Sequence, residues 1–424
     1  MKVLVVGGGG REHALCWKIK KSILVKDLYC APGNGGTASV ATNVPIRAED
    51  VDGIVDFVKK QKIDFVVIGP ESSLNLGIVD MLEKVGVKAF GPSKKAALLE
   101  GSKSFAKNVM KKYGVPTAEF GEFTDMEKAK EYLNSKGAPI VIKADGLAAG
   151  KGVYICKTVE EGMKAIDEIM VQKIFGSAGD KLILEECLEG EEASFLVFSD
   201  GKTVLPMDSS QDHKRIFDDD EGPNTGGMGA YSPAPVVNQA VFEKAMQKVI
   251  YPMISGMEKE GATFKGVLYA GLMIKDGEPK VLEFNTRFGD PEAQPLLMRI
   301  ENDIVPVLLG CVDGNLHNEF LVWDQRPSIC VVMASGGYPG DYKKGYEIKG
   351  LEHIREEDGV VVFHAGTKVD HGRIVTDGGR VLGITSIGGD IPGAVENAYS
   401  AAEKISFHGM HFRRDIGRKA IKWL

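Results

Sequence analysis

The sequence lacks the features that mark secreted, zinc-binding or membrane-spanning proteins. Its six cysteines include no C-x-x-C pair, and none has a histidine at the spacing that zinc sites use. No apolar run approaches the ~20 residues that a membrane-spanning helix needs, and the first apolar stretch is too short for a secretory signal. We therefore expect buried, reduced thiols, a cytoplasmic location and no membrane partner.

A surplus of positive charge is missing as well. The 424 residues carry a net charge of −7, and basic clusters such as Lys59-Lys60 and Lys111-Lys112 are short. A nucleic-acid surface needs a broad basic patch, so we expect no nucleic-acid partner. The length and the 43% of hydrophobic residues predict a globular protein of two to four domains. The oligomeric state stays open, with a monomer as one alternative.

Two common nucleotide-binding motifs are incomplete. Four glycines at 7–10 follow an apolar run, but the third glycine of a G-x-G-x-x-G motif falls on Glu12 or His13, which disfavours a nicotinamide dinucleotide. In the loop 143–152, three residues instead of four separate the glycines, and a glycine replaces the Ser or Thr of a P-loop. Both loops still predict phosphate binding, because such turns direct backbone N–H groups at an anion. A tight turn and a mobile surface loop are the respective alternatives.

Strand and helix signals alternate along the chain. The first strands show no polar alternation, so both of their faces are buried, as in a parallel sheet between helices. Later strands include an antiparallel pair across Asp276-Gly277, a good hairpin turn. The predicted strands are 3–6, 27–31, 64–69, 87–90, 140–143, 181–184, 267–274, 280–285, 328–334, 360–364, 373–375 and 381–385, and the predicted helices are 13–21, 51–60, 76–85, 101–112, 239–260, 293–309 and 393–405.

The predicted fold class is therefore a multidomain combination of α/β and α+β units. A parallel-sheet α/β unit comes first, and strands packed with helices after residue 326 predict a small α+β unit at the end. The polar, glycine-rich stretch 206–231 is predicted to be a long loop, and a loop of that length in a globular enzyme is usually functional.

The densest polar constellation is 283–292. On a strand, Glu283 and Asn285 point to one face while Phe284 points into the core. Two oxygen ligands at this spacing suit Mg²⁺, which completes its shell with phosphates and water. Arg287 can present its guanidinium to a carboxylate or a phosphate. A salt-bridged loop is the alternative.

Two further polar segments are candidates for ligand contacts. The chain after strand 181–184 offers backbone groups to an adenine edge, and Glu191 or Glu192 could accept ribose hydroxyls. The stretch 209–215 combines both signs of charge beside the glycine-rich loop and could hold a polar substrate. The alternatives are a solvated acidic face and a structural role for His213.

Taken in this order, the motifs resemble those of the phosphoribosylamine–glycine ligase family of the ATP-grasp superfamily. The likeness covers essentially the whole chain and rests on 7–15, 31–36, 143–153, 211–215 with 223–233, 283–294, 363–367 and 413–417. The resemblance implies an N-terminal α/β domain at 1–102, an ATP-grasp region at 103–326 with a lid at about 122–190, and a C-terminal α+β domain at 327–424. It also implies the stand-alone, prokaryotic arrangement, without fused domains.

The same resemblance implies an enzyme of purine biosynthesis. It would join glycine to 5-phosphoribosylamine with ATP and give glycinamide ribonucleotide, ADP and phosphate through glycyl phosphate, with Mg²⁺ as the metal and Mn²⁺ as a substitute. The implied residues are Lys103, Lys143, Gly150, Gly152, Glu185, Glu186, Leu188 and Glu192 for ATP, Glu283 and Asn285 for the metal, Gly9, Gly10, Asn34, Lys214 and Arg287 for the other substrates, and Arg287, Asp212 and Asp290 for acyl transfer.

One departure from the superfamily and two other functions stay open. Many ATP-grasp relatives supply a further carboxylate from the strand at 268–274, where this chain has none and Gly271 stands at the corresponding place, so the number of metals is undecided. Another ATP-grasp ligase, biotin-carboxylase-like or peptide-forming, would release ADP without phosphoribosylamine. A nucleotide-binding sensor would bind ATP and release no ADP.

Overall fold

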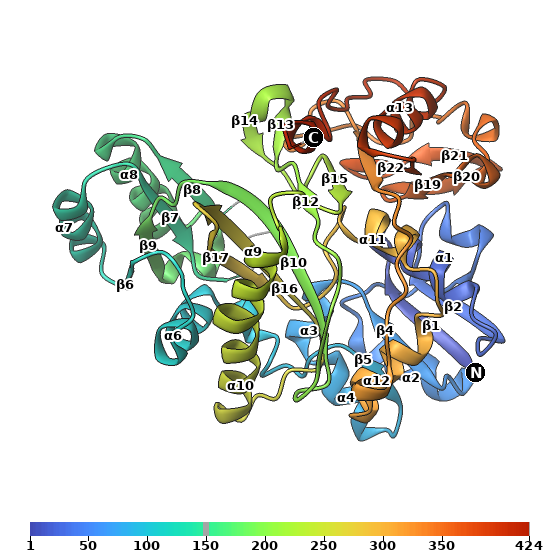
Figure 1. Ribbon diagram of the computed structural model, residues 1–424, viewed down its shortest axis with the longest axis horizontal. Coiled ribbons are helices and arrows are strands. Elements are labelled where there is room, and N and C mark those ends of the chain that lie inside the picture. The colour runs from blue at the N-terminus through green and yellow to red at the C-terminus, as the bar shows by residue number, and fades with distance from the viewer. Residues whose placement is uncertain (147–151, 424) are drawn as a thin grey trace.

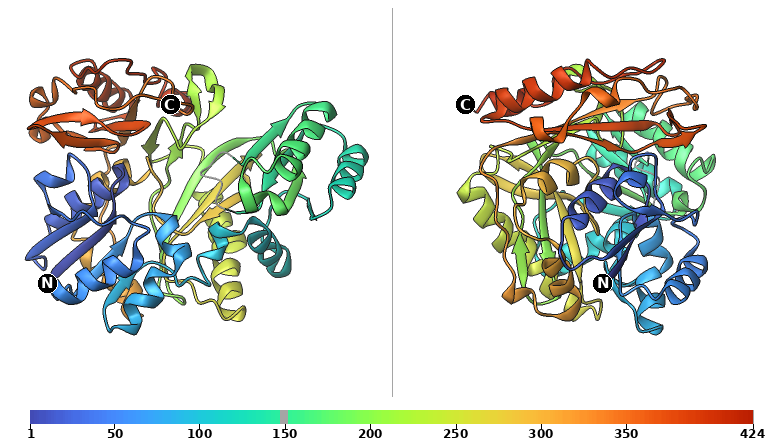
Figure 2. Two further views of the ribbon diagram at one scale, coloured as in Figure 1. Left: turned by 180° about the vertical axis from the view of Figure 1, so that it is seen from behind. Right: turned by 90° about the vertical axis from the view of Figure 1, so that its right-hand side faces the viewer.

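The computed structural model describes residues 1–146 and 152–423 (Figure 1). These residues form four larger sheets and two two-stranded ribbons. Figures 1 and 2 show three bodies around a central sheet: an N-terminal sheet, a lobe at the far end of the molecule and a C-terminal layer. The predicted multidomain α/β and α+β class is confirmed.

The N-terminal sheet is parallel and has the order β3-β2-β1-β4-β5. Its central strand is the apolar run predicted first, and Leu4, Val5 and Val6 are fully buried. Because the chain builds outward from β1 first on one side and then on the other, a topological switch point lies between β1 and β4, where open α/β sheets bind ligands. The strands are β1 (Lys2–Gly7), β2 (Asp27–Pro32), β3 (Thr42–Asn43), β4 (Phe65–Ile68) and β5 (Lys88–Phe90), and α2 (Val51–Gln61) packs beside them.

Two helices begin earlier than predicted, both directly after strands of this sheet. Helix α1 (Gly10–Lys20) starts three residues before the predicted His13, because the carboxylate of Glu12 accepts the N–H of Gly9 at 2.6 Å and caps the first turn. The helix predicted at 76–85 is two helices, α3 (Glu71–Leu76) and α4 (Ile78–Lys84), separated by Gly77 at φ +88°. The strand β3 was not predicted, since two residues leave no periodicity to detect.

The far lobe is an antiparallel sheet in the order β6-β9-β7-β8 with two helices on it, and we call it the lid. Strands 140–143 and 181–184 are confirmed, but the second continues further than predicted. Glu185 and Glu186 lie within it, opposite Val141 and Ile140, rather than in a segment leaving it. The elements are β6 (Phe120–Phe123), α7 (Met126–Lys136), β7 (Ile140–Ala144), β8 (Val153–Cys156), α8 (Val159–Ile166) and β9 (Leu182–Glu186), and α6 (Lys103–Tyr113) precedes them.

The central sheet is antiparallel in the order β11-β10-β16-β17. The predicted hairpin is confirmed, with Asp276 and Gly277 both at positive φ in the turn. The predicted helix 239–260 packs on the outer side of this sheet as α9 (Gln239–Ala245), a π-helical turn (Met246–Ile250) and α10 (Tyr251–Lys259), and the strands are β10 (Glu191–Ser199), β11 (Val204–Pro206), β16 (Gly266–Lys275) and β17 (Glu278–Asn285).

The stretch 206–231 was predicted to be one long loop, and that prediction is wrong. It holds β12 (Gln211–Asp212), the ribbon β13 (Arg215–Phe217) with β14 (Glu221–Asn224), and β15 (Gly229–Ser232). The polar side chains hid these strands because short strands of a partly solvated sheet need little apolar sequence. Strands β12 and β15 join the C-terminal strands in the order β12-β15-β18-β22-β19, so the middle of the chain and its end share one sheet.

The C-terminal layer confirms the predicted strands and helix. They are β18 (Ser328–Ala334), β19 (Val360–His364), β21 (Arg373–Thr376), β22 (Arg380–Ile387) and α13 (Ile391–Ala402), with β20 (Thr367–Asp370) in addition. The helix predicted at 293–309 breaks into α11 (Ala293–Arg299) and α12 (Val305–Asp313). Among the described residues, no helix combines the length and the apolar character that crossing a membrane would require.

Candidate functional site

Three lysines gather where the lid meets the central sheet. Lys143 on β7 and Lys107 on α6 both pair with the buried carboxylate of Glu185, Lys107 at 2.5 Å. Lys103, the first residue of α6, donates to the carbonyl of Gly146 at 2.7 Å. We call these three lysines and Glu185 the lysine cluster. Burial acts to lower the pKa of Lys103 and of Lys107, and it outweighs the nearby carboxylates in both cases.

Glu185 is the buried carboxylate of the lysine cluster. Its side chain is 3% exposed and pairs with Lys107 and Lys143, so it holds these two cations in place beside the segment predicted to contact ATP. Glu186 and Leu188 lie at the open end of β9, where Glu186 pairs with Lys280 at 3.5 Å. Gly150 lies outside the described residues, and the carbonyl of Gly152 accepts the N–H of Ala144 at 2.9 Å.

Glu283 on β17 faces four cations from separate parts of the chain. Burial acts to raise its pKa, but Lys214, Lys143 and Lys103, together with Arg287, hold the pKa below its usual value. Lys214 lies 3.9 Å from Glu283 and 3.0 Å from Glu192. The predicted geometry of the strand holds, since Phe284 is buried while Glu283 and its neighbour Asn285 are partly exposed.

Gly271 lies directly opposite Glu283 in the register of β16 and β17. A side chain there would have Glu283 at ordinary contact distance, 3.4 Å from its Cβ. Glu283 and Asn285 are thus the two adjacent oxygen donors on this face, a set that suits a Mg²⁺ ion whose remaining ligands are phosphates and water. No group of three or more His, Cys, Asp or Glu that could hold a metal by itself occurs among the described residues.

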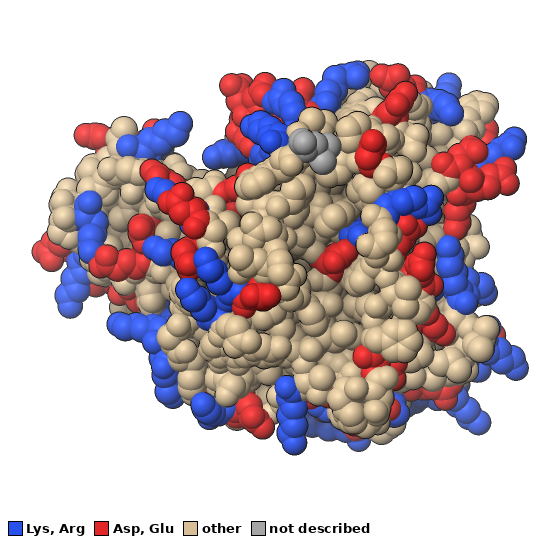
Figure 3. Space-filling view, viewed as in Figure 1, with Lys and Arg blue, Asp and Glu red and all other residues tan. Residues whose placement is uncertain are grey.

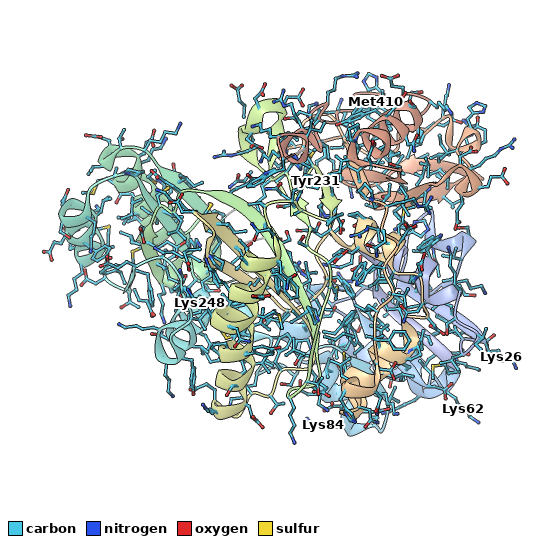
Figure 4. All side chains as sticks on the ribbon, in the orientation of Figure 1. Lys26, Lys62, Lys84, Tyr231, Lys248 and Met410 are labelled. Carbon is cyan, nitrogen blue, oxygen red and sulfur yellow. The ribbon has the colours of Figure 1, made fainter. Side chains whose placement is uncertain are left out.

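Asp212, on β12, lies near three other carboxyl groups, which come from other parts of the chain. Burial raises its pKa to about 8, Lys214 acts against that rise, and Glu292, Glu192 and Glu283 add to it. Its strand is anchored by the buried hydroxyl of Tyr231, which donates to the side chain of the adjacent Gln211. Figure 4 shows Tyr231 at the junction of the central sheet and the C-terminal layer. His213 next to it is fully buried, and burial lowers its pKa to about 3, in line with a structural role.

Three polar groups near Asp212 were not predicted. The buried carboxylate of Glu292 accepts hydrogen bonds from Tyr269 at 2.6 Å and Ser194 at 3.1 Å. Glu292 ends the predicted polar constellation, which is the signal that could have identified it. Tyr269 and Ser194 lie inside apolar strands, so nothing local in the sequence distinguishes them from core residues.

Arg287 is held between two carboxylates of the N-terminal part of the chain. Its guanidinium lies 3.1 Å from Glu71 and 2.7 Å from Glu100, and it donates to Asn285 at 3.2 Å. We call Arg287, Glu71 and Glu100 the arginine cluster. Burial acts to raise the pKa of Glu71, but Arg287 and Arg11 lower it to about 2, whereas burial raises the pKa of Glu100.

The arginine cluster lies at the switch point of the N-terminal sheet. Glu71 starts α3 directly after β4, and its place after a buried strand is the signal that could have predicted it. Glu100 also accepts the N–H and the hydroxyl of Thr286, at 2.7 and 3.0 Å. It is positioned by α5 (Leu98–Gly101), and nothing in the sequence points to it.

The glycine loop at 7–10 already faces two carboxylates. Glu12 accepts the N–H of Gly9, and Cβ atoms built on Gly9 and Gly10 would lie 3.2 and 3.3 Å from the carboxylate of Asp290. Burial acts to raise the pKa of Asp290, but Arg380 and Arg11 hold it below its usual value. The structure thus brings Asp290 to the predicted phosphate loop.

Asn34 lies beside this loop as part of the framework. Its amide donates to the carbonyl of Gly8 at 2.9 Å and to that of His364 at 2.8 Å, and its oxygen accepts from Gly36 and Thr37. The side chain therefore ties the loop to β2 and to the C-terminal layer.

The space between the lid and the C-terminal layer is hollowed, as the notch at the upper left of Figure 3 shows. A cavity of about 820 Å³ lies there, bounded by β8, the ribbon of β13 and β14, the segment 335–340 and His411. Asp212 and Lys214 do not line it, but Arg215, at the end of the predicted stretch 209–215, does. Figure 3 also shows both signs of charge interspersed over this face.

Comparison with known proteins finds one family along most of the chain. Family models described as "Phosphoribosylglycinamide synthetase" match with the N domain at 1–100, the ATP-grasp (A) domain at 101–293 and the C domain at 328–419. A protein named phosphoribosylamine–glycine ligase from Escherichia coli K12 is 51% identical over 426 residues, which cover 100% of this chain and 99% of that protein. The protein of the same name from Vibrio vulnificus CMCP6 is 51% identical over 424 residues, 99% of both chains.

Solved structures agree with the sequence relatives. The phosphoribosylamine–glycine ligase of Thermotoga maritima superposes with a TM-score of 0.87 at 35% identity and covers 98% of this chain and 100% of that one. The biotin carboxylase domain of a Hydrogenobacter thermophilus 2-oxoglutarate carboxylase has a TM-score of 0.74 at 20% identity, covering 97% of this chain and 91% of that one. The second likeness shows a shared fold alone.

Proposed function

The chain belongs to the phosphoribosylglycinamide synthetase family of ATP-grasp proteins, and we propose that it joins glycine to 5-phosphoribosylamine with ATP in purine biosynthesis. The products are glycinamide ribonucleotide, ADP and phosphate. The observation that carries the assignment to the site is the convergence of Lys103, Lys143 and Lys214 on Glu283. The family of the chain and this arrangement together support an ATP-dependent ligase rather than a sensor without turnover.

ATP is proposed to bind between the lid and the central sheet. Lys143 and Lys103 contact the phosphates, and the backbone around Glu186 and Leu188 receives the adenine. Glu192 accepts hydrogen bonds from the ribose hydroxyls, which replace its contact with Lys214. The loop that includes Gly150 and Gly152 covers the phosphates, since Lys103 already contacts its first part at Gly146.

A divalent metal is part of this chemistry, and we propose Mg²⁺, with Mn²⁺ as a substitute, held by Glu283 and Asn285. When bound, the ion neutralises phosphate charge. The Oδ1 atom of Asn285 accepts a hydrogen bond from Arg287 at 3.2 Å, so the guanidinium lies next to the residues that would hold the ion.

The reaction has two displacements. A carboxylate oxygen of glycine bonds to the γ-phosphorus, and the bond from that phosphorus to ADP breaks, which gives glycyl phosphate. The amine nitrogen of phosphoribosylamine then bonds to the acyl carbon, the bond to phosphate breaks, and the nitrogen loses a proton. Arg287 stabilises the negative charge that develops, and Asp212 and Asp290 orient the amine at the switch point, with Gly9, Gly10, Asn34 and Lys214 around the substrates.

Closure of the lid excludes water from glycyl phosphate. The cavity beside β8 leaves room for the lid to approach the C-terminal layer. We also propose domains at 1–102, 103–326 and 327–424, with the lid at about 122–190, and a cytoplasmic location that keeps the six thiols free.

Release of ADP tests the assignment. The purified protein receives ATP, Mg²⁺ and glycine, with and without phosphoribosylamine generated from ribose 5-phosphate and ammonia. We expect ADP only when glycine and the amine are both present, with one glycinamide ribonucleotide per ADP. Release of ADP that is indifferent to the amine would reject phosphoribosylamine as the acceptor, and no release under any combination would reject the ligase.

A further inference from the structure

Arg380 reaches the site from a distant part of the chain. It is the first residue of β22 in the C-terminal layer, and one of its guanidinium nitrogens donates to the carbonyl of Asp290 at 2.5 Å. Its other terminal nitrogen lies 3.6 Å from the carboxylate of the same residue. One side chain of the C-terminal layer therefore binds both the backbone and the side chain of Asp290.

The same guanidinium holds the glycine-rich turn that follows β14. It donates to the carbonyl of Gly226 at 2.7 Å, and the N–H of Gly226 donates to the hydroxyl of Tyr338 at 3.0 Å. Both polar groups of this glycine are thus bound by the C-terminal layer. Space is tight, since a Cβ on Gly226 would lie 2.9 Å from Arg380, and one on Gly227 would lie 2.5 Å from Pro291.

The two held segments face the reacting groups. Asp290 lies against Gly9 and Gly10 of the N-terminal loop. The turn at 226–227 is followed by Met228 and Gly229, and the carbonyl of Gly229 accepts the N–H of His213, the neighbour of Asp212 in the chain. Arg380 therefore connects the phosphate loop, Asp290 and the strand of Asp212. Its side chain is 22% exposed, less than that of the surface arginines of the same layer.

We propose that Arg380 is a positioning residue for acyl transfer, which keeps Asp290 and the turn at 226–227 in place so that the amine, and not water, attacks glycyl phosphate. The inference rests on the function proposed above. Arg380 contacts none of the residues proposed for the ATP phosphates, so formation of glycyl phosphate does not depend on it. Without it, the acyl phosphate forms but is partly lost, because misplacement by about 1 Å can slow an oriented attack by up to ~10²-fold.

The ratio of ADP to glycinamide ribonucleotide measures this effect directly. Arg380→Met keeps most of the apolar stem of the side chain and removes its donors and its charge. We expect the ratio to rise from one in the wild type to about five or more, with the KM for ATP changed less than about two-fold. Arg380→Lys, which keeps the charge and fewer donors, should restore part of the coupling.

Two further variants separate positioning from general damage. Arg373→Met removes an arginine whose side chain is 66% exposed on β21 of the same layer, and its ratio should stay at one. Tyr338→Phe removes only the acceptor for the Gly226 N–H and should raise the ratio less than Arg380→Met; it decides the matter if Arg380→Met does not fold. A ratio of one in every folded variant of Arg380 and Tyr338 would overturn the proposal, as would a loss of turnover that comes entirely from a higher KM for ATP. Wild-type ADP release that ignores the amine would instead count against the proposed function itself.

Discussion

The lysine cluster and the arginine cluster are both buried groups of ion pairs, but their charges are balanced in opposite directions. Lys107 and Lys143 pair with the single carboxylate of Glu185 at the lid, with Lys103 near Lys143, whereas two carboxylates surround the single guanidinium of Arg287 at the switch point. The first cluster has more cations than carboxylates, and the second has more carboxylates than cations. This difference supports the proposed binding of the polyphosphate at the lid and of the amine at the switch point.

Both clusters also pair buried cations with carboxylates of the protein while no ligand is bound. A lone buried ion is costly, so each cation that is meant for a ligand has a protein partner in the free state. Glu185 serves the two lysines, and Glu71 with Glu100 serves Arg287. We propose that ligand binding exchanges these partners instead of leaving buried charges unpaired.

The largest effect should come from removing the cation of the arginine cluster. Arg287→Met should lower kcat about 10²–10³-fold, because one positioned charge at a developing anion typically contributes that much. Affinity for ATP should stay near that of the wild type, since the nucleotide lies at the other cluster. Steady-state rates and nucleotide binding would be measured beside Arg355→Met, which changes an arginine 71% exposed at the surface. Near-normal turnover would show that the two clusters do not divide the work as described.

Removing a cation from the lysine cluster should act on the nucleotide instead. Lys143→Met should weaken ATP binding about 10–100-fold, the loss expected for a hydrogen bond to a charged group. Lys107 remains beside Glu185, so the carboxylate keeps one partner and the protein should stay folded. Equilibrium binding of ATP gives the answer, with the exposed Lys136→Met on the lid as the control. An unchanged affinity would place the phosphates elsewhere.

A third test asks what burial does to a group outside both clusters. Burial lowers the pKa of His213 to about 3, with help from Lys419 and Arg413, and against Asp220 and Asp415. Because the folded pKa lies below that of the unfolded chain, the stabilising contribution is present above about pH 6.5 and is lost as the pH falls toward 3. One such histidine should lower the free energy of unfolding by about 1 kcal/mol between pH 6.5 and 5.5.

His213→Gln should remove that share of the pH dependence. Urea denaturation at the two pH values, followed by circular dichroism, compares the slope of this variant with those of the wild type and of His353→Gln, whose histidine is 66% exposed. Equal slopes in all three proteins would mean that His213 does not titrate as an isolated buried group.

The smallest effect should come from an ion pair at the surface. Lys88 pairs with Asp313 at 2.6 Å, but the two side chains are 50% and 32% exposed. Lys88→Ala should change the free energy of unfolding by no more than about 0.5 kcal/mol, since exposed pairs contribute little. Denaturant titration measures this, and a loss as large as that of a buried pair would erase the contrast between surface pairs and the clusters.

Predictions from the sequence succeeded where a pattern is local. The period of apolar residues located β18 and β19 to the residue, and the Asp276-Gly277 turn located the hairpin of β16 and β17. They failed where another part of the chain decides, since the polar stretch 206–231 forms strands because C-terminal strands lie beside it. The early start of α1 is a local feature that was missed, because Glu12 caps the helix from within its own first turn.

The candidate site divides in the same way. Glu283, Asn285 and Arg287 could be named together because they share one strand and its end, where spacing sets direction. Glu100, Tyr269 and Arg380 could not, since each resembles an ordinary helix or strand residue in its own segment. Glu185 was placed in a ligand-facing segment, and the structure shows it as the buried partner of two lysines.

The sequence by itself determined the family, the fold class and the residue types that chemistry on phosphate and carboxylate requires. It did so because periodicity, turns and motifs are properties of neighbouring residues. Only the tertiary structure decided which charges meet. Arg287 contacts Glu71, which is 216 positions away in the chain, and Arg380 contacts Asp290, which is 90 positions away. Such pairings depend on how separate sheets pack, which no local pattern encodes.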